Sequence, residues 1–431
     1  MKGSDFLDEM ENISPELIEA ADNKAVGRKS RVMKYTALAA SIFLVVAGAS
    51  VLFKKPVKPE PVAPVWEGSE KVYDSARWGS KTGEAFRLGQ AFSVPEIHFG
   101  TYGFEGLKAA DPAKIHPDNP WTESFGEGYL PVYASRKYDV SGAGFPIGLS
   151  ELEMREYLGW LCQTLGQKTV CIGEKMEQTP LQKYYASFYK KGVAVPPKYL
   201  VKVMSRLTAY TDKGNMEISA NGEARIDIQG KYVSCDITSD DPEDMIYAVA
   251  EEYSSLLGFE EPVINIYYQK RWDKNIEEMV DVPLCIVWEG VGDQRSRILD
   301  YNLYRLSFMY FDDVLSIVID NVYLTAEKIG DYPVIDEAAA VERLKAGYYA
   351  SSYWEPFRGE EYIGKIELVY RHGPFDKLIM PYYRIYLLID PMNEKDEEDR
   401  KNGIESYAAY YVPAIADEYV TDMPVYDGRF N

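Results

Sequence analysis

The sequence predicts an α+β protein made of antiparallel sheets with helices packed on one face. We expect two or more lobes and one N-terminal transmembrane helix. Three observations carry this prediction. Strand-like segments dominate and are joined by hairpin turns. Helices of clear period are each followed by strands. One stretch of 19 residues, Tyr35 to Phe53, carries no charge.

Length and composition indicate a folded, acidic protein. A chain of 431 residues has room for two or three domains. The formal net charge is -21, and such a field repels nucleic acid, so we expect no nucleic-acid partner. Tyrosine is the most unusual residue, with 35 copies, and its abundance favours half-buried strands over a binding surface.

The uncharged stretch at 35–53 matches a membrane span. As a helix it would be about 28 Å long, close to the thickness of the bilayer's hydrocarbon core. More Lys and Arg precede it than follow it, so residues 1–34 are expected in the cytoplasm and the remainder outside. The alternative is signal-peptide cleavage after Ala49, before Ser50. We therefore expect a single-pass protein of the cell membrane, with the lipid bilayer as one partner.

A proline-rich linker follows at 54–65. Its sequence, KKPVKPEPVAPV, has too few large apolar side chains for a core and is typical of a semi-rigid polyproline II spacer. The chain beyond it is predicted to form a first extracytoplasmic α+β region at 66–300 and a C-terminal α+β lobe at 301–431.

Two long helices are predicted in the first region. Ser150 and Glu153 form a capping box, and Gly166 ends the helix that follows. Its apolar stripe consists of Met154, Leu158, Leu161 and Leu165. The second helix starts at Asp241 and Pro242 and ends at Gly258. Its stripe is predicted to consist of Met245, Val249, Tyr253 and Leu256.

Two hairpins and a C-terminal unit complete the predicted elements. Asn221-Gly222 joins MEISA to EARIDI, and Asp312-Asp313 lies between LYRLSFMY and VLSIVID. In the last unit, Asp336 caps a helix that ends at Gly347, and the strands KIELVY, LIMPYYRIYLLI and AAYYVPAI follow. The side chains predicted on the buried side of this sheet are Ile366, Leu368, Ile385, Leu387 and Ile389, together with Val341 and Leu344 of the helix.

Two stretches resemble known families. The opening, from ISPELIEAA through RKSRVMKYTALAASIFLVV, resembles clostridial single-pass membrane proteins, some of them described as anti-sigma-factor-like. The closing unit, with YPVIDEAAAVERLKAGYY ahead of LIMPYYRIYLLI and YYVPAI, is similar to the YycH and YycI accessory proteins of Gram-positive sensor kinases. Those proteins have one membrane helix and PepSY-like extracytoplasmic lobes. The resemblance implies a regulatory role without catalysis.

The residues that most often carry chemistry form no recognisable motif. His98, His116 and His372 are scattered, and no nucleotide-binding or hydrolase motif is present. Among the four cysteines only Cys162 and Cys171 are close enough in sequence to suspect a disulfide. The acidic clusters at 236–244 and 390–399 are interpreted as a helix start and a solvated loop. We therefore predict no catalytic residues, no metal site and no cofactor.

Aromatic residues supply the candidate binding face. Tyr348, Tyr349, Tyr353 and Trp354 are the candidates for a sugar- or peptide-binding platform, with Tyr382, Tyr383 and Tyr386 as a second run. Alternation along strands would turn half of them inward. The leading hypothesis is a membrane-anchored regulatory or sensory accessory protein that binds a membrane or envelope protein. The alternative is a protein that binds or cleaves cell-envelope glycans.

Overall fold

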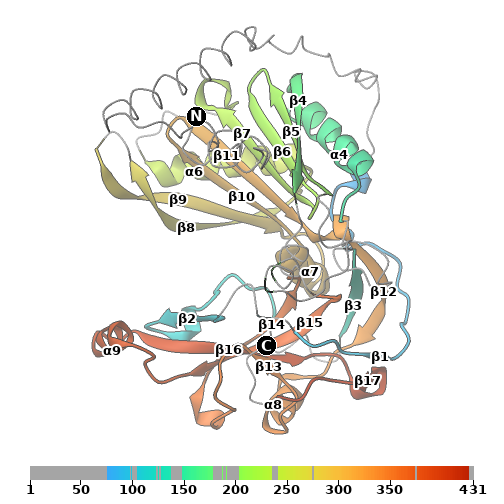
Figure 1. The fold of residues 1–431 in the computed structure, drawn as a ribbon, viewed down its shortest axis with the longest axis vertical. Helices are drawn as coiled ribbons and strands as arrows, with labels where there is room; N and C mark the ends of the chain where they lie inside the picture. Colours follow the sequence, from blue (N-terminus) through green and yellow to red (C-terminus); the bar gives the residue numbers. More distant parts are fainter. Residues whose placement is uncertain are drawn as a thin grey trace, which may run out of the picture. The chain divides into compact units, whose positions relative to one another are not determined.

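The computed structural model divides the chain into two units, Met1–Val62 and Ala63–Asn431, and every residue that it describes belongs to the second unit (Figure 1). The described residues are 75–97, 99, 104–122, 125, 128–136, 148–177, 187, 191, 203–234, 241–273, 276–373 and 376–426. The predicted tail, membrane span and linker therefore lie outside them. Within the described ranges, no helix is long and apolar enough to cross a membrane.

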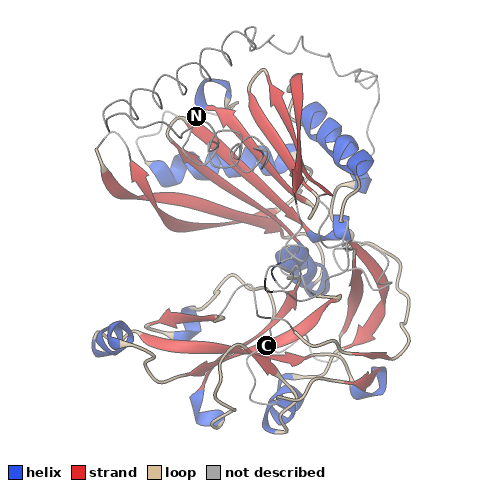
Figure 2. Ribbon diagram, in the orientation of Figure 1, coloured by secondary structure: helices blue, strands red, loops and turns tan. Residues whose placement is uncertain are grey.

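The predicted class is confirmed, because the described chain is α+β with antiparallel sheets (Figure 2). Its strands form one eight-stranded sheet, one seven-stranded sheet and one short pair of strands. Five α-helices fall within the described residues: α4 (Glu151–Thr164), α6 (Pro242–Leu256), α7 (Gln294–Leu303), α8 (Glu337–Lys345) and α9 (Glu394–Lys401).

The eight-stranded sheet is antiparallel throughout and has the order β4-β5-β6-β7-β11-β10-β9-β8. Its strands are β4 (Thr169–Glu177), β5 (Val203–Thr211), β6 (Gly214–Ser219), β7 (Glu223–Gln229), β8 (Pro262–Asp273), β9 (Glu278–Glu289), β10 (Tyr304–Phe311) and β11 (Val314–Asn321). Both predicted hairpins are confirmed. Asp312 and Asp313 have φ values of 54° and 58°, which suit the two-residue turn between β10 and β11. Strands β6 and β7 are joined by three residues, 220–222, and Gly222 has a φ of 93°.

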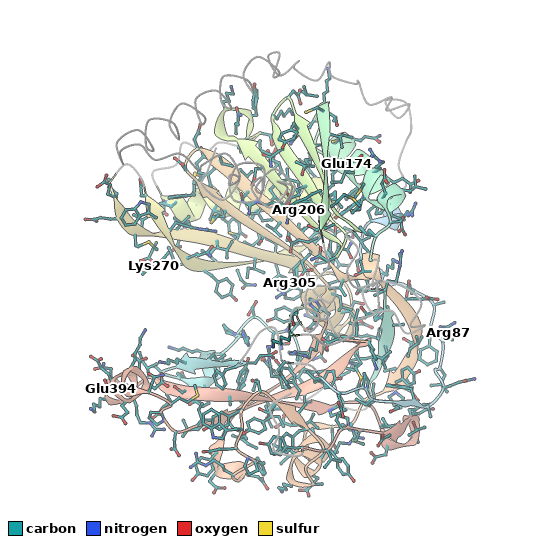
Figure 3. All side chains as sticks on the ribbon, viewed as in Figure 1. Arg87, Glu174, Arg206, Lys270, Arg305 and Glu394 are labelled. Atoms are coloured by element: carbon teal, nitrogen blue, oxygen red, sulfur yellow. The ribbon has the colours of Figure 1, made fainter. Side chains whose placement is uncertain are left out.

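One face of this sheet forms a hydrophobic core with α4 and α6. The register aligns a row of buried side chains across neighbouring strands: Met216, Ile226, Ile317, Phe308 and Cys285. Both helices contact strands of this sheet. The opposite face is polar, because side chains alternate along each strand. There Arg206, labelled in Figure 3, forms an ion pair with Glu217 at 2.9 Å.

The capping predictions for α4 and α6 are confirmed. The Ser150 hydroxyl accepts a hydrogen bond from the Glu153 amide, and the Glu153 carboxylate accepts one from the Ser150 amide. The predicted stripe of α4 is buried throughout. Asp241 caps α6, but Met245 is only half-buried and Leu256 is exposed, whereas the residues that follow them, Ile246 and Leu257, are buried. The apolar stripe of α6 therefore begins one position later than predicted.

The seven-stranded sheet has the order β12-β3-β15-β16-β13, with β14 paired to β15 and β2 paired to β16. Its strands are β2 (Gly106–Ala109), β3 (Tyr129–Ser135), β12 (Ala326–Pro333), β13 (Ala350–Ser351), β14 (Ile363–Arg371), β15 (Leu378–Leu388) and β16 (Glu405–Pro413). All its pairs are antiparallel. The short pair β1 (Phe92–Ser93) and β17 (Val420–Asp422) is parallel.

The two large sheets do not divide the chain at residue 300, where the predicted C-terminal lobe begins. Strands β10 and β11, at 304–321, complete the eight-stranded sheet. Strands β2 and β3, at 106–135, join the seven-stranded sheet beside strands more than 240 residues further along. Each sheet is therefore built from separate parts of the sequence.

The C-terminal unit has the predicted helix and antiparallel strands. Asp336 caps α8 through a hydrogen bond from the Ala339 amide, and α8 contacts β16. Most of the side chains predicted on the buried side are buried: Leu368, Ile385, Leu387, Ile389 and Leu344. Ile366 and Val341 are only half-buried.

The acidic segment at 390–399 is not the loop that was predicted. Its second half is the start of α9, with Asn393 as the cap. Asp396 is buried because it accepts hydrogen bonds from the Met392 amide and the Asn393 side chain, and it forms an ion pair with Lys108. Acidic residues in the first turn and basic residues in the last turn suit the helix dipole.

Candidate functional site

The four predicted platform aromatics do not share one exposed surface. Tyr348 and Trp354 are 39% and 53% exposed, whereas Tyr349 and Tyr353 are buried. Tyr349 stacks on Tyr426 with the ring centroids 4.8 Å apart. The second predicted run, Tyr382, Tyr383 and Tyr386, is buried as well. Half of the first group therefore belongs to the core.

A different cluster gathers on one face of the seven-stranded sheet. Arg384 on β15 lies between two cross-strand neighbours, Glu367 on β14 and Tyr411 on β16. Arg371 is four residues after Glu367 on β14, so its side chain leaves the same face. Glu105, just before β2, completes the group, and its carbonyl accepts a hydrogen bond from the Ala409 amide of β16.

Glu367 is the buried anchor of the first half of this cluster, with only 1% of its surface exposed. It accepts a 2.7 Å hydrogen bond from Arg384 Nε, and His116 Nδ1 lies 2.9 Å from the same oxygen. Burial opposes ionisation of Glu367, but the hydrogen bond with His116 and the charge of Arg384 outweigh it and lower the pKa of this carboxyl. The site thus contains a buried, ionised carboxylate held against an arginine.

Arg371 anchors the second half of the cluster. Its Nη1 donates to both oxygens of Glu105, at 2.8 and 2.7 Å. The guanidinium lies over the rings of Phe99 and Tyr411, 4.9 and 5.1 Å from their centroids. The Tyr411 hydroxyl donates to Glu105 at 2.7 Å, and burial raises the pKa of Tyr411 to about 12. These contacts hold the guanidinium in one orientation.

The two halves line a common cavity of about 360 Å³. Its walls include Arg371, Arg384, Glu105 and Tyr411, together with Val369 and the turn at His372 and Gly373. A cavity of this volume falls at the lower end of the range for small-molecule sites. It combines an apolar wall with charged groups that are already fixed in place, which is an arrangement suited to binding.

The cluster forms no recognisable sequence motif, because its members are dispersed. Glu105 and His116 meet Arg371 and Glu367 across about 250 residues. One signal was available in the sequence: Glu367 and Arg384 are charged residues in the interior of the largely apolar strands KIELVY and LIMPYYRIYLLI. A charge at such a position requires a partner on a neighbouring strand.

The other candidate residues are accounted for separately. Cys162, Cys171 and Cys285 are free thiols, so the suspected disulfide between Cys162 and Cys171 is absent. His98, Cys235 and the acidic residues at 236–240 lie outside the described residues. No group of acidic, cysteine or histidine side chains within the described ranges could hold a metal ion.

The fold and this cavity together define an antiparallel α+β protein with a small, arginine-lined cavity. No protein-family model, curated protein or solved structure matches the chain.

Proposed function

We propose that this chain is a membrane-anchored, extracytoplasmic regulatory or sensory accessory protein that acts by binding a membrane or envelope protein partner and catalyses no reaction. Support for the anchor comes from the uncharged span at 35–53 and from the excess of Lys and Arg on its amino side. The proline-rich linker at 54–65 would hold the folded region away from the bilayer. In this proposal, the two large sheets form two extracytoplasmic lobes, as the resemblance to YycH and YycI implies.

The observation that carries the binding role is the paired state of the charged groups in the cavity. Glu367 is bound by Arg384 and His116, and Glu105 is bound by Arg371 and Tyr411. A general acid or base must exchange its proton near neutral pH. The contacts of Glu367 instead lower its pKa, which keeps its charge fixed. Fixed charges orient a ligand or a partner without taking part in proton transfer.

The glycan alternative receives less support from the same geometry. A glycosidase needs two carboxyl groups that flank the bond being cleaved. The two carboxylates of this cluster, Glu105 and Glu367, each hold an arginine. Of the aromatic platform, only Tyr348 and Trp354 are exposed.

The first experiment tests the topology. Protease added to intact protoplasts should remove the region after Lys54 and leave residues 1–34 protected. Lysed protoplasts serve as the control, because there the tail should be digested too. Digestion of the tail alone in intact protoplasts would reverse the proposed orientation, and a mature chain that begins at Ser50 would rule out the anchor.

The second experiment tests the regulatory role. Crosslinking in native membranes, followed by mass spectrometry, should capture a membrane or envelope protein with the full-length chain. A variant whose span is replaced by a cleavable signal peptide is the matched control, since it is released from the membrane and should lose that partner. Hydrolysis of envelope glycans by the purified chain would contradict the proposal.

A further inference from the structure

We infer that the cavity between Arg371 and Arg384 binds the carboxylate group of a small organic monoanion or of a peptide C-terminus. The inference gives a ligand to the sensory role proposed above and rests on that role for its biological purpose. The binding itself is a separate property of the cavity and is measured separately.

The first argument is that both guanidinium groups retain unused donors. Nη1 of Arg371 is occupied by Glu105, and Nε and Nη2 of Arg384 are occupied by Glu367. Nη2 of Arg371 and Nη1 of Arg384 make no hydrogen bond within the part of the chain that the structure describes. Guanidinium nitrogens without a protein partner are normally satisfied by water or by a ligand. Two such nitrogens in one cavity offer donors to both oxygens of a carboxylate.

The second argument is that the donors are already fixed in position. Arg371 is held between Phe99 and Tyr411, and Arg384 is held by the buried Glu367. Tyr411 links the two arginines, because its ring lies under Arg371 and its backbone is paired with that of Arg384. Since these side chains lose little further freedom on binding, more of the interaction energy is retained as affinity.

The third argument concerns the charge of the ligand. The arginine and carboxylate side chains that line the cavity are Arg371, Arg384 and Glu105, which together carry one net positive charge. A monoanion neutralises this charge, whereas a dianion exceeds it. A single negative charge on an organic body suits the site better than phosphate, and Val369 with the Tyr411 ring provides an apolar wall for that body.

The experiment uses the full-length chain in detergent and measures binding by isothermal titration calorimetry. The probes are N-acetylglycine, its neutral amide N-acetylglycinamide, trialanine, C-terminally amidated trialanine, and inorganic phosphate. We expect the free acids to bind and both amides to fail. Tighter binding of N-acetylglycine identifies a small carboxylate as the ligand, and tighter binding of trialanine identifies a peptide terminus. Failure of both acids, or phosphate binding at least as tight, overturns the inference.

The site is tested with Arg371→Lys and Arg384→Lys, which keep the charge but remove the fork of donors. Each should weaken binding of the preferred acid roughly tenfold or more. Arg358→Lys is the matched control, because Arg358 forms ion pairs with Glu355 and Asp390 outside the cavity. The affinity of this variant for the preferred acid should equal that of wild type. Equal affinity in wild type and both cavity variants overturns the assignment.

A second measurement needs no variant and covers the case in which a lysine variant does not fold. Phenylglyoxal modifies accessible arginine side chains, and mass spectrometry locates the modified residues. Saturating N-acetylglycine should protect Arg371 and Arg384 and leave the modification of Arg358 unchanged. Equal modification with and without the ligand overturns the inference. A chain that captures a membrane partner but shows no such protection loses this inference and keeps the proposed function.

Discussion

The Ser80 hydroxyl donates a hydrogen bond to the carboxylate of Asp300, although 220 residues separate the two in the sequence. Asp300 belongs to α7 and is only 1% exposed. Trp78, two residues before Ser80, is buried against Tyr157 of α4. Residues 78–80, near the start of the described chain, are therefore fixed at two points to the folded region.

The stability of the protein should depend on the protonation of Asp300. Burial raises the pKa of Asp300 to about 7, from an ordinary value of 3.8, although the Ser80 hydrogen bond acts in the opposite direction. The folded protein thus holds this proton more tightly than the unfolded chain does. The stabilisation is complete below about pH 4 and is lost as the pH rises through about 7.

We expect Asp300→Asn to remove this contribution. In urea unfolding between pH 4 and 8, the free energy of unfolding of the variant should rise relative to wild type, by an amount on the order of 4 kcal/mol at full effect. In Ser80→Ala, the free energy of unfolding should fall by a larger amount with rising pH than it does in wild type. The substitution removes a hydrogen bond that favours the ionised form of Asp300. Parallel pH profiles for wild type and Asp300→Asn would show that Asp300 does not titrate in this range.

The second prediction concerns the attachment of the segment by Trp78. Its ring stacks on Tyr157 with the centroids 5.0 Å apart, and its carbonyl accepts a 2.7 Å hydrogen bond from the Asn321 side chain. Trp78→Ala should destabilise the protein by about 3 to 5 kcal/mol, as measured by urea unfolding. Trp272→Ala is the control, because Trp272 is 53% exposed, and it should cost less than about 1 kcal/mol. Equal losses in the two variants would argue against the docked tryptophan.

The third prediction concerns the thiols. Cys162 and Cys285 are buried, and burial raises the pKa of Cys285 to about 12, whereas Cys171 is half-buried on β4. At pH 7.5, N-ethylmaleimide should label Cys171 in the folded protein, and Cys162 and Cys285 only after unfolding. Peptide mapping by mass spectrometry checks this. A peptide with Cys162 linked to Cys171 by a disulfide would contradict the structure.

Local signals in the sequence were enough to predict much of the secondary structure. Ser150 with Glu153, Asp241 with Pro242, and Asp336 are caps whose hydrogen bonds form within three residues. The Asn221-Gly222 turn likewise depends only on local conformational preference. Each of these elements is present because the physical cause is contained in the segment itself.

Contacts between distant segments could not be predicted from the sequence. β3 joins β15 across more than 240 residues, and nothing in either strand identifies its partner. Glu105 and Arg371 meet for the same reason, because pairing of β2 with β16 brings Glu105 to the sheet face. The helix α9 was missed because its only buried side chain is Asp396, so it shows no apolar period.

The last prediction tests the strand register of the C-terminal unit. Leu387 is 1% exposed and lies opposite Ile363 on β14 and Ala408 on β16. Leu387→Asp would bury a charge without a partner and should destabilise the protein by several kcal/mol. Leu388 is the matched control on the same strand, because it is only half-buried and points to the opposite face.

Leu388→Asp should therefore lower the melting temperature of the full-length chain less than Leu387→Asp does. Leu387→Ala, which leaves a cavity without adding a charge, should fall between them at a cost of about 2 to 5 kcal/mol. A shift of one residue in β15 would exchange the two faces and reverse the order of the aspartate variants. An unchanged melting temperature in Leu387→Asp would show that Leu387 is not in the core. It would follow that β15 does not pair with β14 and β16 in this register.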